Sequence, residues 1–171
     1  MIENQILWAL KHLSEMHEDD VILYHKLVNT NSLPTAFCPT CRKKSKNNLI
    51  IVMSDWKTTF LDVRIADNKT SFPLSNIKDY QWDWSIEIVY LQGHMYFFLI
   101  HFKYSRCIYA VDALTLKRIA SELKIKNIPI EVFNNDDRIV KIEKDNSSFW
   151  DLEPIICNEL LCENLKRKRK R

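Results

Sequence analysis

Apolar and polar residues alternate along the chain in patterns that predict its main elements. Ile2, Ile6, Leu10 and Leu13 recur at helical spacing, so residues 2–18 are predicted to form an amphipathic helix. Short apolar or β-branched runs predict strands at residues 21–28, 49–53, 58–65, 96–102 and 107–111. Residues 54–57 have a suitable length for a hairpin turn, which would place two of these strands at the centre of the sheet.

Helices are predicted between and after these strands. Asn76 is a suitable N-cap for a helix that ends near Leu91, and Gly93, the only glycine of the chain, suits the turn that follows. Residues 114–125 have the pattern of a surface helix, whereas residues 130–143 predict one or two short strands. The remaining predictions are loops at 29–34 and 66–75, a polar excursion at 35–48, and a last helix at 155–170. This order of elements predicts an α/β fold.

Length and composition favour one globular domain over residues 1–165. A chain of 171 residues can bury a substantial core, and 46% hydrophobic residues lie far from the composition of disordered proteins. No apolar run reaches the roughly 18–20 residues of a membrane span, so we expect no membrane. Five cysteines, an odd number, and a start without a basic leader favour a reducing compartment. We expect the cytoplasm, in association with the nucleoid, or the nucleus in a eukaryotic host.

The positive net charge comes from the end of the chain. Six of the 25 basic residues lie in the tail 166–171, and without them 19 basic residues face 22 acidic ones. Such a tail can contact DNA phosphates without reading sequence, act as a nuclear address, or serve only to keep the protein soluble. The candidate DNA contacts in it are Lys166, Arg167, Lys168, Arg169, Lys170 and Arg171.

One window of the sequence resembles a known family. Phe60-Leu61-Asp62-Val63-Arg64 is followed by Asn68-Lys69-Thr70-Ser71-Phe72-Pro73-Leu74-Ser75-Asn76 and then by Tyr80-Gln81. The window resembles the segment of RecU-type Holliday-junction resolvases in which a strand with Glu-x-Lys runs into a Lys-Thr-Ser/Ala-Phe-Pro-Leu loop and a helix with His-Gln. This resemblance implies the restriction-endonuclease-like fold of the PD-(D/E)XK nucleases, a mixed central sheet flanked by helices. It covers residues 60–81 strongly and the strands at 96–111 weakly.

The resemblance implies a metal-dependent nuclease site. In the superfamily, acidic residues on two central strands hold Mg²⁺ or Mn²⁺, and the lysine helps to position or activate the attacking water. Asp62 and Arg64 lie two residues apart on a predicted strand, so they project to the same face. The resemblance therefore gives Asp62 as metal ligand, with Arg64 and Gln81 completing the candidate catalytic set. Cleavage of a phosphodiester needs both hard oxygen ligands for the ion and a fixed positive charge.

The catalytic strand departs from the family pattern at two positions. Asp62 replaces the usual Glu and is one methylene shorter, which withdraws the carboxylate from its expected place. Arg64 replaces the usual Lys; a guanidinium can bind a phosphate oxygen but cannot act as a base. Tyr80 also stands where the family has His.

The first-strand acid of the family is missing as well. Its expected position falls near Asn48 and Leu49, where no carboxylate stands. Asp55 is the nearest acid, but an aspartate in a hairpin turn is commonly structural. Glu3 on the first helix is another candidate ligand, and its alternative interpretation is an acid that favours the start of a helix.

Two further sets of residues are candidates for binding. Lys69, Thr70 and Ser71 form a phosphate-facing loop in the resemblance, anchored by the three residues that follow; the alternative is a loop fixed by its own packing. Cys38 and Cys41 form a Cys-x-x-Cys pair that Cys157 and Cys162 would complete as a zinc site. Two free loop thiols or a redox pair are the alternatives.

Three functions remain open from the sequence. The first is a metal-dependent, structure-selective endonuclease that cuts branched or double-stranded DNA in recombination and repair, as a homodimer by analogy with a symmetric junction. The second is a protein of the same fold that has lost cleavage and binds DNA or a partner. The third is an interaction module stabilised by zinc.

Overall fold

The computed structural model describes residues 2–16, 22–27, 49–54, 57–92, 94–103 and 105–157. Its strands are β1 (Leu23–Leu27), β2 (Leu49–Ser54), β3 (Lys57–Ala66), β4 (Ser71–Pro73), β5 (Met95–Phe102), β6 (Ile108–Asp112), β7 (Asn127–Pro129) and β8 (Val140–Ile142). Its α-helices are α1 (Ile2–Met16), α2 (Asp79–Gln92), α3 (Ala113–Leu123), α4 (Ile130–Asn135) and α5 (Glu153–Ile156). Within these ranges, no helix is long and apolar enough to cross a membrane.

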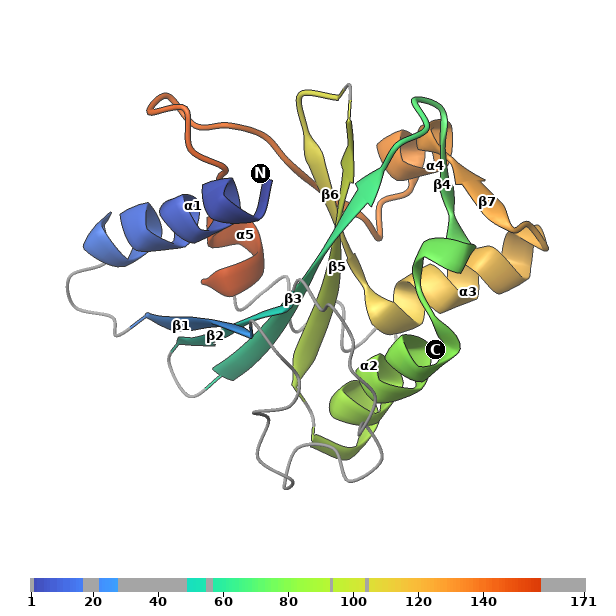
Figure 1. Ribbon diagram of the computed structural model, residues 1–171, viewed down its shortest axis with the longest axis horizontal. Coiled ribbons are helices and arrows are strands. Elements are labelled where there is room, and N and C mark those ends of the chain that lie inside the picture. Colours follow the sequence, from blue (N-terminus) through green and yellow to red (C-terminus); the bar gives the residue numbers. More distant parts are fainter. Residues whose placement is uncertain are drawn as a thin grey trace.

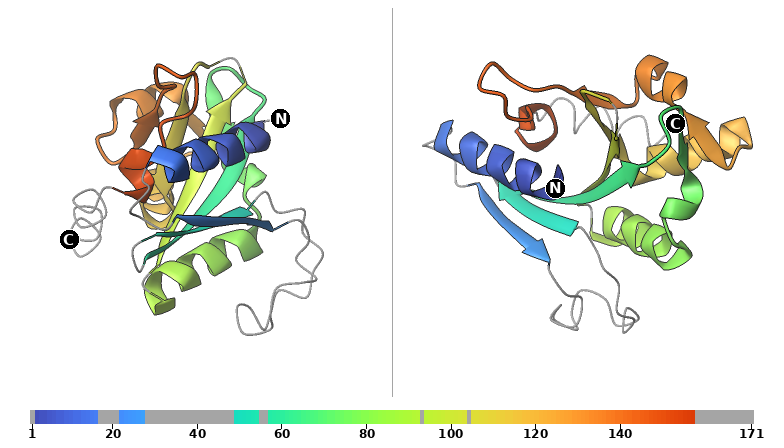
Figure 2. Two further views of the ribbon diagram at one scale, coloured as in Figure 1. Left: turned by 90° about the vertical axis from the view of Figure 1, so that its left-hand side faces the viewer. Right: turned by 45° about the horizontal axis from the view of Figure 1, so that its top comes forward.

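The centre of the fold is a mixed sheet. Among the described residues, six strands lie in the order β1-β2-β3-β5-β6-β8, and only β3 and β5 pair in parallel (Figure 1). The connection between these two strands contains α2, as a parallel pair requires a long crossover. Helices cover both faces of the sheet, as the two views of Figure 2 show. The predicted α/β class with a restriction-endonuclease-like mixed sheet is therefore confirmed.

Alternate residues of the central strands build two separate hydrophobic cores. Leu61 and Val63 of β3 point towards α1 and α5, whereas Phe60 of β3 and Phe98 of β5 point towards α2, α3 and α4. Successive side chains of a strand face opposite sides of the sheet, so a strand buried on both faces is apolar throughout. The almost unbroken apolar run from Met95 to Phe102 follows from this position.

The start of α2 differs from the sequence prediction. Asn76 is not its N-cap; it ends a 3-10 turn, Leu74–Asn76, and Ile77 then has an extended backbone with φ −108° and ψ 116°. The helix begins at Asp79. Gln81 accepts a hydrogen bond from the Lys78 backbone N–H at 2.9 Å, which resembles the reciprocal half of a capping box. The Gln81 side chain thus stabilises the first turn of α2.

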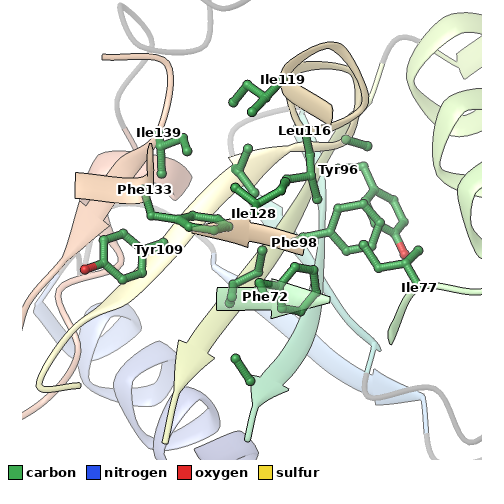
Figure 3. Close-up of a cluster of buried hydrophobic side chains, with 14 of the residues drawn as sticks. Phe72, Ile77, Tyr96, Phe98, Tyr109, Leu116, Ile119, Ile128, Phe133 and Ile139 are labelled. Carbon is green, nitrogen blue, oxygen red and sulfur yellow. The ribbon is translucent and has the colours of Figure 1, made fainter. Parts of the chain in front are cut away.

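Short elements replace two other predictions. The predicted loop 66–75 contains β4, which pairs antiparallel with β7 to form a second, two-stranded sheet. Phe72 of β4 packs against Phe133 of α4 (Figure 3). Within residues 130–143, α4 precedes the single strand β8. Each of β4 and β7 is three residues long and contains a proline, which is too short for an alternating pattern.

Other predicted segments are confirmed or fall outside the described residues. The helices at 2–18 and 114–125 and the five strands predicted between residues 21 and 111 are present within a few residues of their predicted ends. Asp112 caps α3 by accepting hydrogen bonds from Leu114 and Thr115 backbone N–H groups at 3.1 and 3.3 Å. Of the predicted helix at 155–170, α5 covers the beginning. The excursion at 35–48, Gly93 and the tail 166–171 lie outside the described residues.

Candidate active site

Asp62 lies in the middle of β3, at the centre of the sheet. Its side chain is 3% exposed, and its cross-strand neighbours are Leu49 of β2 and Phe98 of β5, both in the core that faces α2. The Tyr96 hydroxyl, also on β5, donates a hydrogen bond to Asp62 Oδ2 at 2.9 Å. A carboxylate is thus held within an aromatic and aliphatic environment.

Arg64 makes an ion pair with Asp62. Its Nη2 donates to the same Oδ2 atom at 2.6 Å, and its Nη1 donates to the Asn76 carbonyl at 3.1 Å. The two side chains therefore lie on one face of β3, in agreement with their spacing. Arg64 also ties the central strand to the 3-10 turn, and its side chain is 15% exposed. In this structure its charge serves to neutralise Asp62.

Burial and pairing oppose each other at Asp62. Burial raises the pKa of its carboxyl group above the ordinary value, while the charge and hydrogen bond of Arg64 and the hydrogen bond of Tyr96 lower it only in part. Burial and the neighbouring Asp62 charge raise the pKa of Tyr96 well above its usual range, so its hydroxyl stays protonated. Tyr96 is thereby kept as a hydrogen-bond donor to the carboxylate.

Leu49 is one of the two residues near which the resemblance predicts the first acid of the family. Its backbone pairs directly with that of Asp62, and its side chain is 1% exposed. A divalent ion such as Mg²⁺ needs several oxygen ligands, of which at least one or two are usually carboxylates. Here a leucine faces Asp62, and a guanidinium and a phenol occupy Oδ2. Asp62 Oδ1 is buried and has no hydrogen-bond partner among the described residues.

The other candidate metal ligands do not join Asp62. Glu3 is buried in the first turn of α1, on the face of the sheet opposite to Asp62. Asp55 lies outside the described residues. Within those residues no three His, Cys, Asp or Glu side chains are grouped as a metal would require. The residues described at this position therefore do not fit a divalent metal centre.

Gln81 has a structural task in this arrangement. It is 5% exposed, and its Oε1 holds the Lys78 backbone N–H at the start of α2. Of the aromatic residues around it, Trp84 is buried and Trp82 partly buried, both against the core facing α2. The catalytic role assigned to Gln81 by resemblance stays a prediction.

The loop before β4 is ordered by its own hydrogen bonds. Asn68 Oδ1 accepts from the Thr70 backbone N–H at 3.0 Å and from the Thr70 hydroxyl at 3.1 Å. The Thr70 carbonyl accepts from the Ile130 backbone N–H at 2.8 Å, which ties the loop to α4. Lys69 and Thr70 are exposed, and Ser71 is half-buried. Phe72, fully buried, anchors the loop as expected.

The remaining candidate residues are only partly described. Cys38, Cys41, Cys162 and the basic residues 166–171 lie outside the described residues, so the zinc site and the tail contacts stay predictions. Cys157, at the end of α5, is half-buried.

Sequence reasoning missed Tyr96. This residue lies 34 positions after Asp62, and only the parallel pairing of β3 with β5 brings the two side chains together. A signal was present, because a tyrosine in an otherwise apolar buried strand needs a partner for its hydroxyl. The sequence alone does not show which residue supplies it.

One comparison with known proteins identifies a family. The family model described as RecU, recombination protein U, matches residues 41–150, well over half of the chain. A comparison with curated proteins gives no match. The matched segment contains Leu49, Asp62, Arg64 and the loop before β4, and it includes the two central strands. The chain therefore belongs to the RecU family, which supports a Holliday-junction-resolvase-like role in recombination.

Proposed function

We propose that this RecU-family protein binds branched DNA in recombination and that it does so without metal-dependent cleavage. The absence of metal-dependent cleavage is inferred from the 2.6 Å ion pair between Arg64 and Asp62 on β3. On the neighbouring strand β2, the residue paired with Asp62 is Leu49 and not a second acid. Nucleases of this family typically depend on a divalent metal, and that dependence needs a cluster of oxygen ligands.

Electrostatics support the loss of a metal centre. Arg64 already neutralises the single carboxylate, so an incoming cation would have to displace a charged hydrogen bond and would meet a like charge within a few ångströms. Tyr96 occupies the same oxygen from the other strand. The pair also connects β3 to Asn76 and so holds the loop and α2 in place. We propose that the Asp62–Arg64 pair maintains the shape of the DNA-binding surface.

Several features of the chain support DNA binding. The loop before β4 presents Lys69 on an exposed turn, and the basic tail adds six charges. Family membership suggests DNA junctions as the partner. A four-way junction has two-fold symmetry, so we propose a homodimer as the binding form. We further propose that the protein works with the nucleoid in the cytoplasm, or in the nucleus of a eukaryotic host.

Metal-dependent endonuclease activity is the second candidate function. One observation favours it: Asp62 keeps a carboxylate at the position of the family's Glu, with Oδ1 free of hydrogen bonds to the described residues. A metal bound there would have to draw its other ligands from outside these residues.

Binding can be tested separately from cleavage. Fluorescence anisotropy with a labelled four-way junction, and with duplex and single-stranded DNA of the same sequence, should show preference for the junction in EDTA as well as in Mg²⁺. Equal affinity for junction and duplex would contradict structure selectivity, and no binding to any DNA would overturn the proposal. Analytical ultracentrifugation of the complex tests the homodimer, which a single protein chain per junction would exclude.

A further inference from the structure

A basic hollow lies at the end of the sheet where β5 turns into β6. Its volume is about 840 Å³, and its walls include Gln5 of α1, His101 of β5, Arg106 of the β5–β6 turn, Lys141 of β8 and Lys144. In Figure 1 this turn lies at the upper end of the sheet, close to the start of α1. We call it the basic hollow.

The basic hollow is distinct from the Asp62–Arg64 site. His101 stacks edge-on against Trp150 at 6.1 Å between ring centres, and Trp150 belongs to the core under α1. Asp62 belongs to the opposite face of the sheet, with the core under α2. A ligand in the hollow therefore does not compete with the side chains of the candidate active site.

The balance of charge in the hollow is positive. Lys141 is paired with Glu143 at 2.6 Å, which leaves Arg106 and Lys144 as exposed cations without an ion pair among the described residues. The Lys144 ammonium lies 5.2 Å from the centre of the Trp150 ring. Ile2 and Gln5, in the first turn of α1, also line the wall.

The cations are held on an ordered frame. Asp145 Oδ1 accepts from the backbone N–H groups of Ser147 and Phe149, both at 2.9 Å, which fixes the turn that follows Lys144. Trp150 donates its indole N–H to Gln5 at 3.1 Å and so joins this turn to α1. The backbone that carries Lys144 is therefore already placed before an anion binds.

The segment that leads from β3 towards β4 is tied to the end of β5, beside the basic hollow. The Lys103 backbone N–H donates to the Ala66 carbonyl at 3.1 Å, and its ammonium lies 4.0 Å from Asp67. The carboxyl ends of β3 and β5 thus lie next to each other (Figure 1), and along the chain Lys69 follows β3 and Arg106 follows β5. A chain of phosphates that crosses this end of the sheet would pass both segments, each of which carries an exposed basic residue, Lys69 or Arg106.

We propose that the basic hollow binds the phosphate backbone of a DNA strand through Arg106 and Lys144, as a second contact on the face opposite to Asp62. This rests on the proposed DNA-binding function and adds a surface to it. A junction has several arms, and contacts on two faces of one edge allow the protein to hold more than one of them. The contacts are to phosphate and therefore independent of base sequence.

The experiment compares two double variants with the wild-type protein. Arg106→Ala/Lys144→Ala removes two charges from the hollow, and Lys11→Ala/Lys117→Ala removes two exposed charges from the solvent sides of α1 and α3. Binding of a labelled four-way junction is measured by anisotropy over a range of salt concentrations. The hollow variant should bind more weakly, with a slope of log K against log salt shallower by roughly 1 per lost phosphate contact. The control should keep the wild-type slope.

Loss of folding is separated from loss of contact. Lys144→Ala also removes a contact with Trp150, so the stability of each variant is checked by thermal unfolding. The double variant Arg106→Lys/Lys144→Arg keeps both positive charges and should bind the junction as the wild type does. A hollow variant that keeps the affinity and slope of the control would overturn the proposal while leaving the proposed function intact. A wild-type protein that binds no DNA would overturn both.

Discussion

Restoring the missing acid offers the strongest internal check on the interpretation of the Asp62 site. The change is Leu49→Asp together with Arg64→Lys, which places a carboxylate opposite Asp62 and removes the guanidinium that donates to Oδ2. We expect this double variant to bind Mn²⁺ or Mg²⁺ and to be stabilised by either. The wild-type protein should respond to neither.

The size of the effect follows from burial. Leu49 is 1% exposed and belongs to the core facing α2, so losing its side chain costs about 2–5 kcal/mol of unfolding free energy. A second buried negative charge beside Asp62 adds to this cost when no ion is present. An ion at 100 times its dissociation constant would return about 2.7 kcal/mol. For a chain of this length that is a rise of roughly 5–11 °C in Tm.

Thermal unfolding in EDTA, Mg²⁺ and Mn²⁺ measures this rise directly. Leu49→Asn with Arg64→Lys is the matched control, because it has the same size and polarity but no second charge, and its Tm should not depend on the ion. If the aspartate variant shows no metal-dependent rise, the site is not a converted metal centre. An equal rise in the wild-type protein would refute the reasoning from the Asp62–Arg64 pair.

Three further predictions follow from the structure and the sequence. Because the pKa of Asp62 is raised in the folded state, its contribution to stability is complete below the unfolded pKa and is lost as the pH rises through the folded pKa. We therefore expect the free energy of unfolding of the wild type, measured in urea, to fall relative to that of Asp62→Asn as the pH rises from acid to neutral. A rise relative to Asp62→Asn would contradict this prediction. Phe72→Ala should cost about 3–5 kcal/mol in the same assay, and Phe72→Leu much less, since Phe72 is fully buried; equal costs would argue against it as the anchor. Removal of residues 166–171 should weaken binding to junction and duplex alike, and a loss confined to junctions would show that the tail recognises structure.

The sequence predicted the large elements because their patterns are long. The helix at Ile2–Met16 has a sustained apolar face, and Met95–Phe102 is apolar along its length. Elements of three residues, such as β4, have no period to detect and exist only through pairing with a distant segment. The start of α2 was misplaced because Asn76 is an acceptable N-cap by type, whereas the extended backbone at Ile77 delays the helix.

The candidate site was predicted in part for a related reason. The spacing of Asp62 and Arg64 indicates that they share a face, and the gap between family acids points to the neighbourhood of Leu49. Neither observation reveals that Arg64 turns back onto Asp62 or that Tyr96 completes the set, because these contacts depend on rotamers and on a long-range parallel pairing. The opposite faces of Glu3 and Asp62 are likewise a property of the assembled sheet.

The measurement that tests the central claim most directly is cleavage of a labelled four-way junction by the purified wild-type protein in Mg²⁺, Mn²⁺ and EDTA, with Asp62→Asn in parallel. The proposal predicts binding to the junction by both proteins and no divalent-dependent product from either. Cleavage by the wild type in Mg²⁺ or Mn²⁺ that disappears in EDTA and in Asp62→Asn would contradict it and would establish the endonuclease.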